Sequence, residues 1–213
     1  MATKLGVYNG ALNEVGERQI ASLTESTEAR RVLDLVYTDV VNECLEEGSW
    51  NFATETVQLD ADTGVTPSFG FTKVFAKPTD WKRTVAISSD EYLASPLLHY
   101  YDDVSYLSAE DDPIYLRYVS NDTGMGFELT RWPQKFTRYV ELALADRVCL
   151  RLNQDKGIRD RIERRLMRAK RSALSTDAMN EANPKFMPEG SWNRSRSVTS
   201  ARGDRGSSNR LTG

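Results

Sequence analysis

The chain has 213 residues, which is enough to bury a sizeable core in one large domain or two small ones. Apolar residues make up 39% and charged residues 28%, as in ordinary soluble proteins, and no apolar run reaches the roughly 18 residues that a membrane helix needs. One histidine and two distant cysteines, Cys44 and Cys149, disfavour a zinc site or a serine-histidine-aspartate triad. We expect two buried thiols and no catalytic residue, metal or cofactor.

Charge is distributed unevenly along the chain, although the net charge is only −3. Met1–Gln154 carries 14 basic and 24 acidic residues, whereas Asp155–Gly213 carries 14 basic and 7 acidic residues. This asymmetry predicts a basic C-terminal part that binds a polyanion or an acidic protein surface.

Two helices are expected near the N-terminus. The first spans Lys4–Gly16, and the second follows after a short connection, so the two should pack side by side. For the second helix, Ser26 is the predicted N-cap and Gly48 the predicted left-handed stop, with Trp50 and Phe52 leaving in an extended segment. Its apolar stripe is broad: Ala29, Val32, Leu33, Val36, Tyr37, Val40, Val41, Cys44 and Leu45.

The middle of the chain has strand-like composition, with Thr, Val and Phe between Gly and Pro turns. We expect a loop at Tyr92–Pro113. The expected strands are Thr54–Asp60, Phe71–Lys77, Trp81–Ser88, Ile114–Val119 and Phe127–Trp132.

Helical periodicity then returns. Apolar residues from Phe136 to Leu152 indicate a buried helix, and Ile158 to Ala173 indicate a last helix with a narrow apolar seam. The expected fold class is α+β, a four-helix bundle with an inserted β-rich domain and an extended C-terminal arm. The expected parts are residues 1–53 and 136–182 for the bundle, 54–135 for the insertion and 183–213 for the arm.

The last helix is the strongest candidate for a binding surface because eight cations lie on it. It could be a solvated helix whose charges pair locally, a surface that contacts an acidic protein partner or a neighbouring subunit, or a surface that contacts DNA phosphates. The cations are Lys156, Arg159, Arg161, Arg164, Arg165, Arg168, Lys170 and Arg171.

The tail beyond Asn183 is rich in Gly, Ser, Asn and Arg, with few apolar residues. It is either a disordered tail or an arm that becomes ordered on a partner, with Phe186 and Trp192 as anchors beside Arg194 and Arg196.

The Tyr92–Pro113 segment is rich in tyrosine and carboxylates. Its acidic residues lack the ordered ligand spacing of a calcium loop, so a solvated loop or an interface is the favoured interpretation. Candidates for such an interface are Tyr92, Tyr100, Tyr101, Asp102, Asp103 and Tyr106, and Glu110, Asp111 and Asp112 complete the acidic cluster.

Several segments in this order resemble one known family. The run Ala29–Ala53, the preceding Leu12–Glu17 and the later Phe75–Trp81 are similar to the tail tubular protein A family of short-tailed phages, as are Ile114–Val119 and the helix opened by Trp132-Pro133-Gln134-Lys135-Phe136. The resemblance covers roughly Lys4–Ala173, and the order and spacing carry it rather than any single motif.

The resemblance implies an assembly protein and not an enzyme. Family members are head-to-tail adaptors in which twelve copies form a ring, with a helical bundle and an inserted β domain. The implied partners are the portal protein, a tail nozzle similar to tail tubular protein B and possible tail fibres or tailspikes. DNA would pass through the lumen without sequence-specific binding, and no membrane is involved. The implied location is the head–tail interface of the virion, reached from the host cytoplasm during assembly.

On this interpretation, one set of residues binds the portal or a subunit: Arg159, Arg161, Arg164, Arg165, Arg168, Lys170, Arg171, Phe186, Trp192, Arg194 and Arg196. A second set faces the nozzle or a fibre: Tyr92, Tyr100, Tyr101, Asp102, Asp103 and Tyr106. The alternatives are a nucleic-acid-binding packaging accessory protein, which the basic C-terminal part suggests, and an enzyme acting on surface polysaccharide, which only scattered carboxylates suggest.

Overall fold

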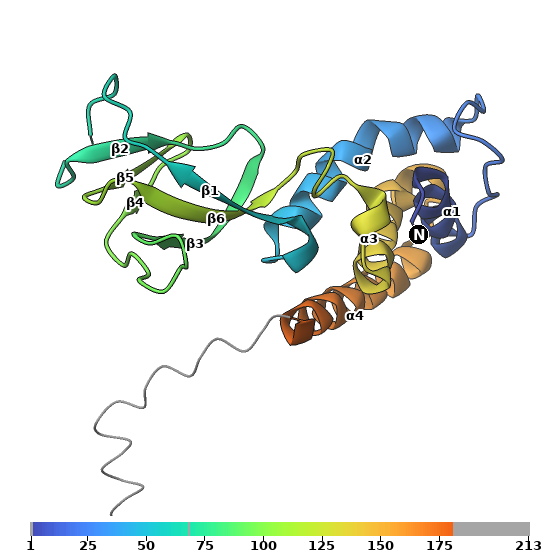
Figure 1. Cartoon of the computed structure of the whole chain (residues 1–213). Helices are drawn as coiled ribbons and strands as arrows, with labels where there is room; N and C mark the ends of the chain where they lie inside the picture. Colours follow the sequence, from blue (N-terminus) through green and yellow to red (C-terminus); the bar gives the residue numbers. More distant parts are fainter. Residues whose placement is uncertain (1, 68, 181–213) are drawn as a thin grey trace, which may run out of the picture. The chain divides into compact units, whose positions relative to one another are not determined.

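The computed structural model describes residues 2–67 and 69–180 (Figure 1). The helices are α1 (Lys4–Val15), α2 (Glu28–Glu46), α3 (Gln134–Leu152) and α4 (Lys156–Asn180). The strands are β1 (Thr54–Leu59), β2 (Lys73–Ala76), β3 (Trp81–Ser88), β4 (Tyr101–Asp102), β5 (Tyr106–Ala109) and β6 (Ile114–Ser120). Two 3-10 turns, η1 (Asn51–Ala53) and η2 (Leu129–Arg131), lie where the strands and helices meet. The expected extended arm at 183–213 lies outside the described residues.

Helix α3 is the centre of the helical part. It packs against both α1 and α2, and its Val140, Leu144 and Val148 are fully buried in the larger hydrophobic core. Gly10 lets α1 approach α3 closely, since a Cβ there would lie 2.5 Å from the carboxyl carbon of Glu141. The prediction that the helices on either side of the insertion come together is therefore confirmed. Contrary to the expected side-by-side packing of α1 and α2, helix α1 packs mainly against α3.

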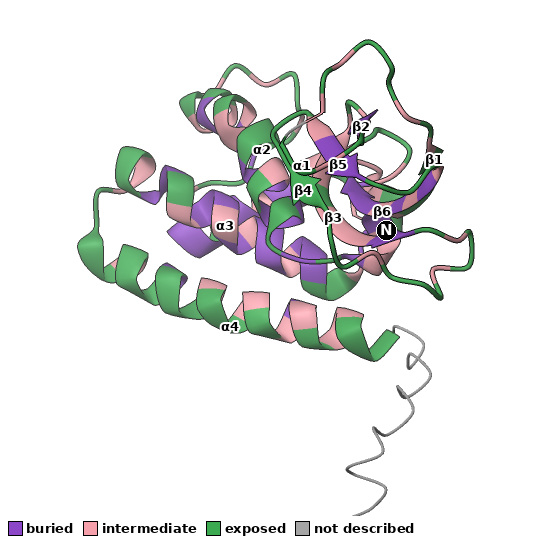
Figure 2. Ribbon diagram, turned by 90° about the vertical axis from the view of Figure 1, so that its left-hand side faces the viewer, coloured by how far each residue is buried: buried purple, intermediate pink, exposed green. Residues whose placement is uncertain are grey.

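The predicted four-helix bundle is wrong. Three helices share the core, whereas α4 contributes only two buried residues, Ile162 and Ala173, and the rest of its apolar seam is only partly buried against that core. Figure 2 shows the difference, since α3 is largely buried and α4 is exposed along most of its length. The reason is compositional, because cations surround the apolar seam of α4 and leave too narrow a face for bundle packing. The fold is an α+β mix with two small antiparallel sheets.

The ends of α2 differ from the sequence expectation. Thr27 is the N-cap, and its hydroxyl accepts from the Arg30 N–H at 3.4 Å. Glu47 closes the helix in right-handed conformation, so Gly48 is not a left-handed stop. Gly48 is required for another reason, because a Cβ there would lie 2.8 Å from the Trp50 ring. The segment after it is not extended either, since η1 turns the chain and buries Trp50 in the core, where its indole N–H donates to the Cys44 carbonyl at 2.8 Å.

The β-rich part consists of two three-stranded sheets, in the orders β1-β6-β3 and β2-β5-β4. A second hydrophobic core lies between them, with Phe75, Leu107 and Leu116 fully buried. Four of the five expected strands are confirmed. The fifth, Phe127–Trp132, is wrong because it contains η2, and β4 and β5 lie in the segment that was expected to be a loop.

The insertion begins and ends at one place beside the helices. Thr54 at the start of β1 pairs with Val119 near the end of β6, and Val119 is buried in the helical core. Arg83 on β3 donates to the carbonyl of Glu46 at 3.0 Å, which fastens the sheet to the end of α2. Both cysteines are buried free thiols, as expected. Across residues 2–67 and 69–180, the structure contains no helix with the length and apolar character needed to span a membrane.

Candidate binding surface

Helix α4 presents its cations in two groups. Ile162 and Ala173 mark the side of α4 that faces the other helices, because they are its buried residues. At 3.6 residues per turn, four arginines spaced by three, four and three residues lie on the opposite side. This arginine stripe consists of Arg161, Arg164, Arg168 and Arg171.

Arg165 lies on the flank of α4 and is held internally. Its guanidinium pairs with Glu14 on α1, and the same carboxylate pairs with Arg138 on α3. Glu14 is only 5% exposed, so its charge is compensated inside the protein by both arginines. Burial lowers the pKa of Arg138, but its hydrogen bonds to Glu14 and Glu141 outweigh burial and raise it. The cluster ties α1, α3 and α4 together.

Two further cations of α4 are also paired with the core helices. Lys170 lies 2.6 Å from the carboxylate of Glu47, to which the Tyr139 hydroxyl also donates. Burial raises the pKa of Glu47, but the hydrogen bonds from Lys170 and Tyr139 outweigh it, so the pKa is lowered overall. Arg159 lies 3.9 Å from Asp146 on α3. The predicted binding residues Arg159, Arg165 and Lys170 are therefore engaged in internal ion pairs.

The C-terminal end of α4 is held at the α2–β1 junction. The Asn51 backbone N–H donates to the Asp177 carboxylate at 3.1 Å, and the Asn51 side-chain amide donates to the Asp177 carbonyl at 2.9 Å. Together with the three ion pairs, this contact fixes α4 at four places along its length. The direction in which the arginine stripe points is therefore set by the fold.

The arginine stripe itself is exposed. Its hydrogen bond within the protein runs from Arg164 Nε to the Asp160 carbonyl at 3.1 Å, and none of its four guanidinium groups is in an ion pair with another described residue. Asp160 and Glu163 add negative charge at the N-terminal end of the same face, so the positive charge is densest from Arg164 to Arg171. Met167, 52% exposed, lies beside it.

The predicted nozzle-facing residues all lie in the insertion, but they differ in how far their side chains are exposed to solvent. Tyr92 is 82% exposed, and Tyr100 and Tyr101 are also exposed. Tyr106 is half-buried at the start of β5. Asp102 is used internally, because it pairs with Lys77.

Lys77 is a structural residue that the sequence analysis did not single out. Its side chain is 3% exposed and its ammonium lies 3.7 Å from the centre of the Trp81 ring. It also donates to the carbonyl of Asp103 at 2.6 Å, while the side chain of Asp103 turns back to the Val104 N–H. Little in the sequence signals this role, since a Pro-Thr-Asp segment separates Lys77 from Trp81.

A cleft of about 420 Å³ lies at one end of the insertion, and no pattern in the sequence indicates it. It lies between the loop Ser89–His99 and the turn at Glu110–Asp111. Leu98, which is 91% exposed, contributes to its wall.

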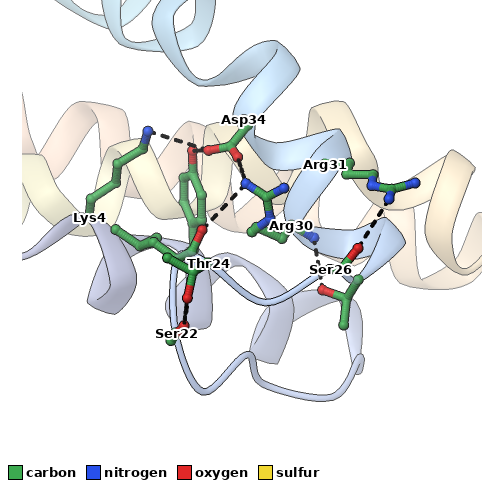
Figure 3. Close-up of polar contacts among 10 residues, drawn as sticks. Lys4, Ser22, Thr24, Ser26, Arg30, Arg31 and Asp34 are labelled. Atoms are coloured by element: carbon green, nitrogen blue, oxygen red, sulfur yellow. Dashed lines mark hydrogen bonds and ion pairs between the residues drawn. The ribbon is translucent and has the colours of Figure 1, made fainter.

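A separate charged cluster joins α1 to α2 (Figure 3). Asp34 accepts from the Tyr8 hydroxyl at 2.8 Å and from Arg30 at 2.6 Å, and Lys4 lies 3.4 Å away. Burial raises the pKa of Asp34, but the hydrogen bonds from Tyr8 and Lys4 outweigh it and lower the pKa. Because its charges are compensated in this way, the cluster is a clamp between two helices and not a binding surface.

The remaining predicted portal-binding residues, Phe186, Trp192, Arg194 and Arg196, lie outside the described residues. Within residues 2–67 and 69–180, no three His, Cys, Asp or Glu side chains are grouped so that they could hold a metal ion. No protein-family model matches the chain, and no curated protein matches it either.

Proposed function

We propose that this protein is a structural head-to-tail adaptor of a short-tailed phage, forming a ring that joins the portal to the tail nozzle and lets DNA pass. The proposal is supported by the resemblance of Lys4–Ala173 to the tail tubular protein A family. The structural observation that carries it is the arginine stripe, a row of exposed cations on a helix whose other cations are held by the core.

A row of arginines suits attachment to an acidic protein surface. A guanidinium group offers a planar set of donors that binds carboxylates in bidentate fashion, and it is more weakly hydrated than an ammonium group. Four such groups, from Arg161 to Arg171, span about 15 Å of helix, a length that fits a protein–protein contact of ordinary size. The portal, or a neighbouring subunit in the junction, is the partner that this function requires.

The attachment of α4 favours the same function. A helix held by Arg159, Arg165, Lys170 and Asp177 does not have to become ordered when it binds, so the entropic penalty of association is smaller. The paired charges on the inner flanks also keep the outward arginines from folding back onto the core carboxylates.

A nucleic-acid-binding packaging accessory protein is the second candidate, and the same stripe is the observation that favours it. Its four arginines would contact few phosphates, and residues 1–180 carry 22 basic against 28 acidic residues, which repels a polyanion over most of the surface. The balance of charge therefore favours an acidic protein partner.

The test is a charge reversal of the whole stripe, R161E/R164E/R168E/R171E. Arg165 is left intact because a carboxylate there would face the buried Glu14. We expect the variant to fold normally and to lose ring formation on purified portal assemblies, as seen by electron microscopy and co-sedimentation. A matched control reverses four exposed cations elsewhere that are in no ion pair with a carboxylate of the described residues, and it should form rings as wild type does: Arg18, Arg31, Arg131 and Lys135.

Two results would overturn the proposal. One is a stripe variant that forms rings on portal assemblies as well as wild type does. The other is a wild-type protein that ignores portal assemblies but shifts duplex DNA with a steep salt dependence, which would support the packaging accessory protein instead.

A further inference from the structure

Three segments of the insertion meet at one end, which we call the acidic tip. In the first sheet, Leu59 at the end of β1 pairs with Ile114, and Ser88 at the end of β3 pairs with Tyr115. Strands β1 and β3 therefore both end where β6 begins. The loops that follow β1 and β3 and the turn that precedes β6 must lie side by side at this end.

Two contacts hold these loops together. The ring of Phe71, from the β1–β2 loop, stacks on the ring of His99, from the β3–β4 loop, with the centres 4.9 Å apart. The Ala61 N–H donates to the Asp112 carboxylate at 3.3 Å, which joins the β1–β2 loop to the turn before β6. The tip is thus a built surface and not three independent loops.

The tip combines negative charge with exposed apolar and aromatic groups. Phe69 is fully exposed, Leu98 is 91% exposed and Tyr92 is 82% exposed. Lys73 also lies at this end, but its ammonium group is paired with the carboxylate of Asp112 at 3.6 Å. Exposed carboxylates gather around them: Asp60, Asp62, Glu91, Glu110, Asp111 and Asp112.

The acidic tip and the arginine stripe are complementary surfaces of the same chain. Among the described residues, no ion pair connects the tip to α4. The tip extends across three adjacent strand ends, about 10 Å, and the stripe is about 15 Å long, so the two match in size. Carboxylates beside exposed tyrosines are also the surroundings that arginine prefers, since guanidinium groups stack on aromatic rings as well as pairing with carboxylates.

We propose that the arginine stripe of one copy binds the acidic tip of the next copy. Because the two surfaces are different patches of one chain, the contact is heterologous, and repeating it produces a ring when the rotation closes. Arg164, Arg168 and Arg171 pair with Glu91, Glu110 and Asp111, while Met167 packs against Leu98. The inference rests on the proposed function for the ring, and it names the partner of the stripe as a neighbouring subunit.

The proposal is tested by exchanging the charges of the two surfaces. The stripe variant is R161E/R164E/R168E/R171E, and the tip variant is E91K/E110K/D111K. Each variant alone places like charges in every contact between copies, so we expect ring assembly on portal to fall at least tenfold, as counted by electron microscopy. In an equal mixture, a ring with an even number of copies in which the two variants alternate has opposite charges in every contact, so assembly should return to within about twofold of wild type.

A control variant of the same charge change, D39K/E43K/E46K on the exposed side of α2, should assemble normally. The proposal is wrong if the tip variant assembles as wild type does, or if the mixture assembles no better than its components. Loss in the stripe variant alone would show that the stripe binds the portal, which leaves the proposed function standing. If wild type does not bind portal, the same variants are compared for salt-sensitive self-association by sedimentation equilibrium, where rescue by mixing is again required.

Discussion

Replacing Glu14 by Gln should loosen α4 from the core. The carboxylate is 5% exposed and binds Arg138 on α3 and Arg165 on α4. Removing one charge of a buried ion pair usually destabilises a protein by several kcal/mol, because the other charge is left unpaired. Here both arginines are partly exposed, at 34% and 45%, and Arg138 keeps Glu141 at 3.0 Å, so water and Glu141 compensate part of the loss.

We therefore expect the free energy of unfolding to fall by about 2 kcal/mol. For a chain of this size the melting temperature should fall by about 4–8 °C. Urea unfolding followed by far-UV circular dichroism measures the change. Relative to wild type, amide hydrogen exchange should accelerate more in α4 than in α3. In this comparison R147A is the control, because its pair with Glu43 is about half exposed on both sides and should contribute about 0.5 kcal/mol or less.

An E14Q variant within about 0.5 kcal/mol of wild type, with unchanged exchange in α4, would refute this reasoning. It would mean that α4 is held by its apolar seam and by its other ion pairs, and that the buried carboxylate contributes no net stability.

Three other predictions concern Glu47, Cys44 and Gly126. Folding lowers the pKa of Glu47, so its pairing with Lys170 stabilises the fold above the ordinary pKa of about 4.5, and this contribution is lost as the pH falls through the lowered value. The difference in free energy of unfolding between wild type and E47Q, measured in urea, should therefore shrink on acidification. A difference that stays constant with pH would contradict this prediction. Burial raises the pKa of Cys44 to about 12, so a thiol reagent at pH 8 should label it only after unfolding, and rapid labelling of native protein would count against the packing described. In G126A, the new Cβ would lie 2.2 Å from the Ser120 carbonyl oxygen, so the backbone must move and we expect about 3 kcal/mol of destabilisation, where a change under 1 kcal/mol in the same assay would be inconsistent.

The helices and most strands could be predicted because their signals are local. Apolar periodicity located α1 to α4, and alternation between Gly and Pro turns located β1, β2, β3 and β6. The same signals failed for short or irregular segments. Strands β4 and β5 have two and four residues in a Tyr- and Asp-rich stretch, which gives no usable period. Phe127–Trp132 has the composition of a strand, but its Trp132 indole donates to the Gly126 carbonyl in a tight turn.

The candidate surface could be predicted only in part. A helical wheel shows that cations surround the seam of α4, but it cannot show which of them are paired. The partners of Arg165 and Lys170 are Glu14 and Glu47, more than 100 residues away along the chain, so their pairing depends on tertiary structure alone. The acidic tip could also be predicted only in part: Glu110, Asp111 and Asp112 are adjacent in the sequence, but only the register of β1, β3 and β6 brings the loops after β1 and β3 beside them.

The pairing of Thr54 with Val119 places the entrance and the exit of the insertion on neighbouring antiparallel strands. The β-rich part can therefore be treated as a cassette, meaning a unit whose length and outer loops can change while the distance between its two ends stays the same. Cutting the cassette out and joining its two stems by a short turn should leave α1 to α4 with the same neighbours. Exchanging it for another cassette would give the same helical platform a different specificity.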